Sequence, residues 1–380
     1  MKHTAIFFIN QSIPFFFFSL LFAPLMLFGQ NSQKLAIALT PELWQFQPQK
    51  VEFKQHEGVA AMKILPDAGS VVLHDFVFSD FTLEFDTQLP DPSSVSVYFR
   101  WNGSKMNECF SLRTARAGHP AAGVAVQYAP SVSGVSLSDI LPHFQGKADF
   151  KRDTWTHVKV VVSGAQMRAY VNHALVLEVM QLEGETTQGR IAFGGQALIA
   201  RLTVTPKEVE HLSPQPGIDP TTGDPRYLRH WQVSAAFHTP ENVAFSADFL
   251  PNAQTVWETI EAERRGLVNL TRPFGESDTR RFAWLKVTIN TATALKRKIE
   301  LGLSDEVWVF LNGRLLSADK TPYGQSAGKD QTGQCTPQNS SFSLPLTAGA
   351  NELLIGVANN FCGWGLIAKL DSPEGLTVGQ

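Results

Sequence analysis

The chain has 380 residues, a formal net charge of −3 and 43% hydrophobic residues. A nearly neutral chain without a basic stripe lacks the electrostatic footprint of a nucleic-acid-binding protein, so no nucleic-acid partner is expected. The length is sufficient for two domains that each bury a core of their own.

The first thirty residues predict export. A weakly basic start precedes a run rich in Phe and Leu, which ends at Gly29 and Gln30. This pattern is typical of a secretory signal peptide, and we predict one over residues 1–29. The alternative is an uncleaved membrane anchor, but Pro14 and Pro24 interrupt the run, and its unbroken apolar part is short for a bilayer-spanning helix. No later stretch is long enough to span a membrane, so we expect the mature protein in the periplasm or outside the cell.

Five prolines between residues 205 and 227 divide the chain. Proline fixes φ and removes a backbone donor, so this stretch cannot lie inside a sheet and is typical of a semi-rigid linker. We therefore predict one β-sandwich at 35–206, a Pro-rich linker at 207–225 and a second β-sandwich at 226–376.

Alternation of apolar and polar residues dominates both halves. Residues 81–89, 282–290 and 295–303 alternate with a period of two, and we find no amphipathic helix of any length. Short alternating runs separated by Gly, Pro, Asn and Ser predict antiparallel sheets. The predicted fold class is all-β, with two antiparallel β-sandwich (jelly-roll) domains in tandem.

Each half contains the same kind of hairpin. Asn172-His173 lies within "AYVNHALV", and Asn312-Gly313 lies within "VFLNGRLL". Asn-Gly between apolar runs is the strongest short signal for a two-residue turn, because both of its central residues need a positive φ. The segments around the two hairpins differ. We therefore interpret the hairpins as the same type of turn in two different domains and not as an internal repeat.

The first half resembles the concanavalin A-like sandwich family, particularly laminin G-like and 3-keto-disaccharide hydrolase-like domains. The segments that carry this resemblance are 80–103, 154–179 and 189–206, and it covers roughly residues 40–206. It implies an antiparallel sandwich that handles carbohydrate, either as a binding module or as an enzyme.

The second half is built from different segments. Ser304-Asp305, Asn312-Gly313, the Gly-Ala-Asn turn at 349–351 and the Gly-Trp-Gly loop at 363–365 follow one another in this order. The order resembles a galactose-binding-like jelly roll, over roughly residues 226–376. Such modules accompany glycosidases and sugar esterases, so the resemblance again implies a carbohydrate ligand.

Two carboxylates in the first half are candidates for catalysis. Glu84 and Asp86 share one face of a predicted strand, which is similar to the acidic strand of some glucan-cleaving concanavalin A-like enzymes. Those enzymes carry a further carboxylate three residues on, where this chain has Leu89. Retaining hydrolysis needs two carboxyl groups about 5 Å apart, one of them protonated. The alternative is the solvated face of a half-buried strand.

A second set of residues predicts ligand binding. Alternation in "VSVYFRWN" places Tyr98 and Arg100 on one face, and Trp101 on the other with the valines. Arg113 and Gln127 extend the polar face if their strands neighbour this one, and Glu84 and Asp86 would complete it. Guanidinium and amide groups bind sugar hydroxyls, and an aromatic ring contacts the apolar face of a sugar. The alternative is an ordinary outer face with compensating charges.

In the second domain, Trp364 is either an exposed sugar platform or a buried core residue. The predicted ligand-binding residues are therefore Tyr98, Arg100, Arg113, Gln127 and Trp364.

The sequence predicts no cofactor or metal site. The ten histidines are scattered without zinc-site spacing, and a structural calcium ion is left open. "GQSAG" at 324–328 fits the esterase pattern G-x-S-x-G, but it lacks the flanking strand and helix which that motif requires. Cys335 and Cys362 could form a disulfide that leaves Cys109 as a free thiol, and the geometry that decides this is not in the sequence.

Three functions stay open, because a fold does not decide a function. The first is a secreted, lectin-like carbohydrate-binding protein without a complete catalytic set. The second is a glycoside or 3-keto-disaccharide hydrolase, acting on glycosidic bonds with its site on the first sandwich. The third is a structural or adhesive surface protein.

Overall fold

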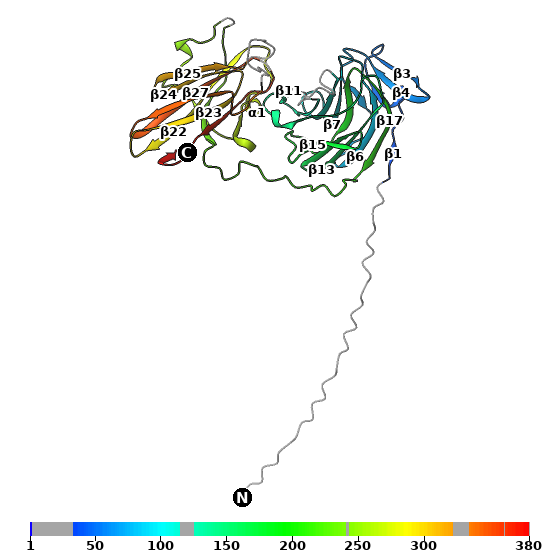
Figure 1. Cartoon of the computed structure of the whole chain (residues 1–380), viewed down its shortest axis with the longest axis horizontal. Helices are drawn as coiled ribbons and strands as arrows, with labels where there is room; N and C mark the ends of the chain where they lie inside the picture. The colour runs from blue at the N-terminus through cyan, green and yellow to red at the C-terminus, as the bar shows by residue number, and fades with distance from the viewer. Residues whose placement is uncertain (2–32, 115–124, 241–242, 322–333, 361, 380) are drawn as a thin grey trace. The chain divides into compact units, whose positions relative to one another are not determined.

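The computed structural model describes residues 1, 33–114, 125–240, 243–321, 334–360 and 362–379. The predicted signal peptide, apart from Met1, and the G-x-S-x-G motif lie outside these residues. Almost every regular element described is a strand, and the strands pair antiparallel (Figure 1). The all-β prediction is therefore confirmed. No helix in the described ranges has the length and apolar character that a membrane crossing requires.

Two sheets make up the first sandwich. The β6 sheet runs in the order β15 (Ala174–Val179), β14 (Gln166–Val171), β13 (Thr156–Ser163), β6 (Phe81–Gln88), β17 (Ala197–Pro206), β4 (Val59–Ile64) and β3 (Val51–His56), with β1 (Leu35–Ala36) on β17. The β7 sheet runs in the order β12 (Gln145–Gly146), β9 (Val126–Tyr128), β8 (Glu108–Arg113), β7 (Ser94–Trp101), β16 (Arg190–Gly195), β5 (Val71–Leu73) and β2 (Trp44–Gln45). A hairpin of β10 (Ser131–Val132) and β11 (Val135–Ser136) and the short helices η1 (Pro41–Leu43) and η3 (Pro142–Phe144) accompany them.

The inner faces of these two sheets meet through aromatic side chains. Phe85 of β6 lies edge-to-face on Phe193 of β16, with ring centroids 5.1 Å apart. Phe81 of β6 meets Phe99 of β7 in the same way at 6.0 Å. Alternation along each strand directs these rings inward, which is the usual construction of a sandwich core.

Strand β7 contains a bulge that the alternation did not predict. Tyr98 pairs with Ala192 and Trp101 pairs with Arg190, so three steps along β7 oppose two along β16. Arg100 has a φ of 48°, the left-handed conformation typical of a bulge. The extra residue reverses the alternation beyond Phe99. The prediction that Arg100 shares the exposed face of Tyr98 is therefore wrong, and so is the prediction that Trp101 shares the face of the valines.

Arg100 instead lies inside the sandwich, with only 4% of its surface exposed. Its guanidinium donates hydrogen bonds to the carbonyls of Ser79 at 3.2 Å and Gly164 at 2.7 Å. The fully buried carboxyl of Glu108 accepts a hydrogen bond from Tyr128 Oη at 2.7 Å. A buried charge is tolerated only when it is paired and hydrogen-bonded. Arg100 meets this condition through these carbonyls and an ion pair with Asp80 Oδ1 at 3.6 Å, whereas burial raises the pKa of Glu108 to about 7.

Two further sheets make up the second sandwich. The β22 sheet runs in the order β20 (Trp257–Glu261), β18 (His230–Ser234), β22 (Arg281–Thr291), β27 (Gly349–Asn359), β24 (Glu306–Leu311) and β25 (Arg314–Lys320), with β19 (Phe237–His238) and β29 (Leu376–Val378) on β22. The β23 sheet runs in the order β21 (Leu267–Asn269), β28 (Gly365–Leu370), β23 (Leu295–Ser304) and β26 (Ser340–Leu346). The helices are η4 (Ala247–Phe249), η5 (Arg264–Gly266) and α1 (Thr271–Phe274).

The β22 sheet is covered on both faces. One face joins the main core, and the other carries Phe282, Trp284, Trp308 and Phe310. The segment around η4 lies over these rings, and Trp284 Nε1 donates to the carbonyl of Phe249 at 2.6 Å. A third layer of structure therefore packs on this sandwich.

Both predicted hairpins have the expected turns. Asn172 and His173 have φ values of 48° and 68°, and Asn312 and Gly313 have values of 49° and 77°. Each Asn side chain also accepts a backbone N–H from a further strand: Asn172 from His157 and Asn312 from Glu352. A short polar side chain at this turn thus fixes a third strand as well as the two that it joins.

The two sandwiches share buried contacts within residues 33–380, which form one compact unit. Asp139 of the first accepts hydrogen bonds from Ser304 Oγ at 3.0 Å and from the backbone N–H of Gly363 at 2.9 Å. The linker is also attached, since the N–H of Gly217 donates to the carbonyl of Met180 at 2.7 Å. The predicted domain boundaries stay a prediction.

Cys109, Cys335 and Cys362 are all free thiols in the structure.

We predict that Arg100→Leu lowers the free energy of unfolding by about 2–5 kcal/mol, because it leaves the carbonyls of Ser79 and Gly164 without their donor and the buried Glu108 carboxyl without a nearby cation. Urea denaturation followed by fluorescence measures this. Arg168→Leu is the matched control, since its ion pair with Glu178 is partly exposed and should cost less than about 1 kcal/mol. Equal losses in both variants would contradict the assigned role of Arg100.

The stability of the folded protein should depend on pH, because three of its carboxyl groups are buried. Burial raises the pKa of Glu108, Asp139 and Glu183 to about 7 each. Their pKa values in the unfolded chain lie near ~4, so the folded state holds more protons between about pH 4 and 7. Stability should therefore fall by at least ~1 kcal/mol as the pH rises from 5 to 8. Thermal unfolding across this range tests it, and Glu108→Gln should give a shallower profile. A melting temperature that rises with pH would refute the prediction.

Candidate functional site

The outer face of the β7 sheet brings together three of the predicted ligand-binding residues. The register aligns Gly194, Ser96, Ser111 and Gln127 in one row across β16, β7, β8 and β9. Tyr98 lies in the next row, between Ala192 and Cys109. Arg113 ends β8 opposite Ser94. Directly opposed residues share a face, so Tyr98, Arg113 and Gln127 project on the same side.

Small residues occupy the middle of this face. The hydroxyls of Ser96 and Ser111 are 3.0 Å apart, and Cys109 Sγ lies 3.5 Å from Ser111 Oγ. Gly194 makes room for the neighbouring ring, because a Cβ there would lie 3.0 Å from Cε2 of Tyr98. The small side chains leave the hydroxyls of the row beside the Tyr98 ring, with little side-chain bulk around them.

An arginine and a glutamine form the polar end of the face. Arg113 Nη2 donates to Gln127 Oε1 at 2.6 Å, and Gln127 Nε2 donates to the carbonyl of Ser138 at 2.8 Å. Gln127 is buried, so both ends of its amide are fixed. It therefore positions the guanidinium of Arg113, which is partly exposed.

An aromatic pair forms the other end. The rings of Tyr98 and Trp101 lie 5.3 Å apart and are tilted by 59°. Both pack on Val72 and Ala192 outside the main core. Burial raises the pKa of Tyr98 to about 12, so its hydroxyl is a neutral donor at physiological pH. Trp101 reaches this face only because of the bulge at Arg100, which is why the sequence analysis missed it.

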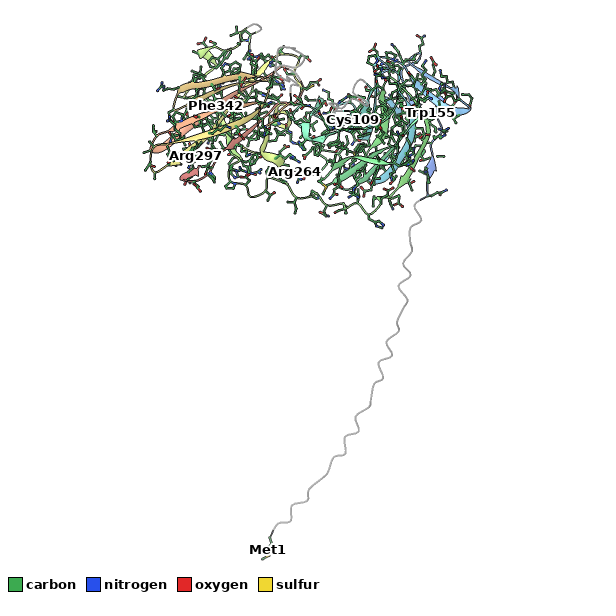
Figure 2. All side chains as sticks on the ribbon, in the orientation of Figure 1. Met1, Cys109, Trp155, Arg264, Arg297 and Phe342 are labelled. Atoms are coloured by element: carbon green, nitrogen blue, oxygen red, sulfur yellow. The ribbon has the colours of Figure 1, made fainter. Side chains whose placement is uncertain are left out.

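Glu84 and Asp86 lie elsewhere. Their strand β6 belongs to the other sheet of the sandwich, so the prediction that they complete the face of Tyr98 is wrong. The sequence places both carboxylates on one strand face, but the choice of sheet depends on strand order, which alternation does not contain. Figure 2 labels Cys109 on the β7 sheet and Trp155, which precedes β13 of the β6 sheet.

The two carboxylates take part in a network of ion pairs. Asp86 accepts from His157 Nδ1 at 2.8 Å and from Arg201 Nη1 at 2.6 Å, and Glu84 accepts from Lys34 Nζ at 2.6 Å. Burial alone would raise the pKa of Glu84, but the hydrogen bond and charge of Lys34 hold it below its usual value. Glu84 is therefore ionised near neutral pH, which does not suit the protonated carboxyl of a glycosidase.

Trp364 is a core residue. It has no exposed surface, and its ring lies 5.4 Å from that of Phe274 and 5.0 Å from the guanidinium of Arg281. The alternative of an exposed sugar platform is thereby excluded. Among the described residues, no group of three His, Cys, Asp or Glu side chains is placed to hold a metal ion.

Comparison with known proteins finds a family to which part of the chain is similar. A family model described as a 3-keto-alpha-glucoside-1,2-lyase-like domain matches residues 41–201, which is less than half of the chain. No curated protein matches the sequence.

Several solved structures match the chain at low similarity. The carbohydrate binding module CBM66 from Bacillus subtilis is 15% identical over 43% of this chain and 91% of its own, with a TM-score of 0.31. A galectin-like protein of unknown function from Bacillus subtilis is 12% identical over 43% and 90%, with a TM-score of 0.33. A putative glycosyl hydrolase from Parabacteroides distasonis is 11% identical over 45% and 98%, with a TM-score of 0.34.

The resemblance predicted for residues 40–206 is thus confirmed by the family model, while the galactose-binding-like resemblance of the second half stays a prediction. In its first sandwich, over residues 41–201, the chain is similar to the 3-keto-alpha-glucoside-1,2-lyase-like domain family.

Proposed function

We propose that this is an exported, lectin-like carbohydrate-binding protein whose ligand lies on the outer face of the β7 sheet. The observation that carries the proposal is the joint placement of Tyr98, Arg113 and Gln127 around the row of small hydroxyl side chains. The match of residues 41–201 to a glucoside-related family supports the same class of ligand.

Each part of this face has a counterpart in a sugar. The Ser96 and Ser111 hydroxyls can donate to and accept from sugar hydroxyls. The Arg113 guanidinium, positioned by Gln127, adds charge-assisted donors. The Tyr98 ring offers an apolar surface to the C–H face of a pyranose. The arrangement supports binding by hydrogen bonds and aromatic contact.

The charge on this face suggests how to classify the glycan. A neutral sugar would bind with little dependence on salt. An acidic glycan would use Arg113 as its anchor, and its affinity would fall as salt rises, because ions screen exposed charges. A titration at two salt concentrations therefore separates the two classes.

An enzyme acting on a glycoside or 3-keto-disaccharide is the second candidate. The description of the matching family favours it, since that family is named for chemistry on 3-keto-glucosides. Glu84 and Asp86 would be its carboxylates if it worked as a two-carboxyl glycosidase. Their ion pairs with Lys34, His157 and Arg201 do not favour that role.

We predict that Arg113→Ala weakens glycan binding at least about tenfold, which corresponds to ~1.4 kcal/mol of lost interaction. A glycan array identifies the ligand, and calorimetry measures the affinity. The matched control is Arg168→Ala on the β6 sheet, which should bind like the unchanged protein. Circular dichroism checks that both variants are folded. Equal affinity in all three proteins would place the site elsewhere.

A second prediction separates binding from catalysis. Incubated with 3-keto-disaccharides and plain oligosaccharides, the unchanged protein should bind without releasing products. Chromatography of the mixture over time measures this. Product release that Glu84→Gln or Asp86→Asn removes would overturn the binding function and support the hydrolase.

A further inference from the structure

The second sandwich has a pocket of its own, far in sequence from the face described above. Its volume is about 430 Å³, within the range of pockets that hold small organic ligands. The lining residues come from β18, β20, β21 and α1 and from the segments that join them.

One wall of the pocket is polar and fixed. The Glu263 carboxylate accepts hydrogen bonds from Arg272 and, at 3.3 Å, from Asn269 Nδ2. Asn269 is 3% exposed, and its Oδ1 accepts the N–H of Thr271 at 3.1 Å. Arg272 also donates to the carbonyl of Glu183 at 2.9 Å. Carboxylate, amide and guanidinium are therefore held in place before any ligand arrives.

Other lining residues are apolar. Val233, Ala235 and Ile260 line the pocket from the paired strands β18 and β20 and the residue after β18. Phe274 lines the pocket from α1 and is backed by the buried ring of Trp364. An aromatic side chain supported from behind is a rigid surface for the C–H face of a ring.

The strand register adds a second carboxylate. Glu258 pairs with Val233, whose side chain faces the core, so Glu258 projects on the pocket side of β20. Glu261 has the opposite parity on the same strand and lies 3.4 Å from His230 Nδ1, and it also lines the pocket. Three Glu residues, Glu258, Glu261 and Glu263, therefore line the pocket with a single guanidinium, that of Arg272, which Glu263 already engages.

We propose that this pocket binds one pyranose unit without an acidic group, and best when the sugar carries an amine. The polar wall suits vicinal hydroxyls, and the Phe274 side suits the apolar ring face. The excess of carboxylate attracts an ammonium group and repels a uronic acid. The proposal concerns a second site and does not depend on the face of the β7 sheet.

The test uses the exported chain with glucosamine, glucose and glucuronic acid as probes, followed by ligand-observed NMR and titration. Glucosamine should bind most tightly, glucose less so, and glucuronic acid at least tenfold more weakly than glucosamine. Raising the salt should weaken glucosamine binding and leave glucose binding nearly unchanged. Glucuronic acid binding that is as tight as that of glucosamine and that Ala235→Trp removes, or no binding of any probe, would overturn the proposal.

Two variants on the pocket and two controls locate the site. Ala235→Trp fills the pocket from its exposed rim and should abolish binding of all probes. Glu258→Gln should weaken glucosamine binding at least fivefold, whereas Glu352→Gln, on β27 and not among the lining residues, should not.

Arg168→Ala on the β6 sheet should leave these affinities unchanged, and Arg113→Ala measures any contribution of the β7 face. If Arg113→Ala removes glucosamine binding and the pocket variants do not, the second site is refuted while the proposed function stands.

Discussion

One extra residue in β7 decides how the first sandwich divides its polar groups. The bulge turns Arg100 inward, where it hydrogen-bonds the carbonyls of Ser79 and Gly164. It also turns Trp101 outward to Tyr98. A strand without the bulge would turn the arginine to the outer face of the sheet and the tryptophan to the inner face. The buried arginine and the aromatic pair on the outer face therefore have the same origin.

The inward arginine explains why an acid can stay buried nearby. Glu108 shares the inner face of β8 with Phe110 and Leu112, a position where a carboxyl is costly. Tyr128 bonds both this carboxyl and the backbone N–H of Glu183. Arg272 of the second sandwich donates to the carbonyl of Glu183. A continuous polar path therefore connects the interior of one sandwich to the pocket wall of the other.

The features that the sequence predicted correctly are those that depend on residues close together in the chain. Strands β6, β22 and β23 begin and end within a residue or two of the alternating runs, because a period of two is a property of consecutive residues. The two Asn turns were also predicted correctly, because the positive φ that such a turn requires depends on the residue type at single positions.

The errors have a common physical cause, which is that they depend on partners distant in sequence. The bulge at Arg100 arises in pairing with β16, and the separation of Glu84 from Tyr98 arises from strand order. The burial of Trp364 depends on Phe274 and Arg281. The pocket around Glu263 gave no signal in the sequence, because no motif links its residues.

The third layer over the β22 sheet has a consequence for how this sandwich opens. The segment around η4 contacts the aromatic rings of that sheet, and among its described residues only those of the short β19 join the ladder. It can therefore detach while β18, β22, β27 and β24 keep their backbone pairing. Amide hydrogens near Phe249 would exchange through this local opening, and those of β22 and β27 only through global unfolding. We therefore expect two cooperative units of unequal stability in the second sandwich, the weaker of which covers the aromatic side chains of the β22 sheet.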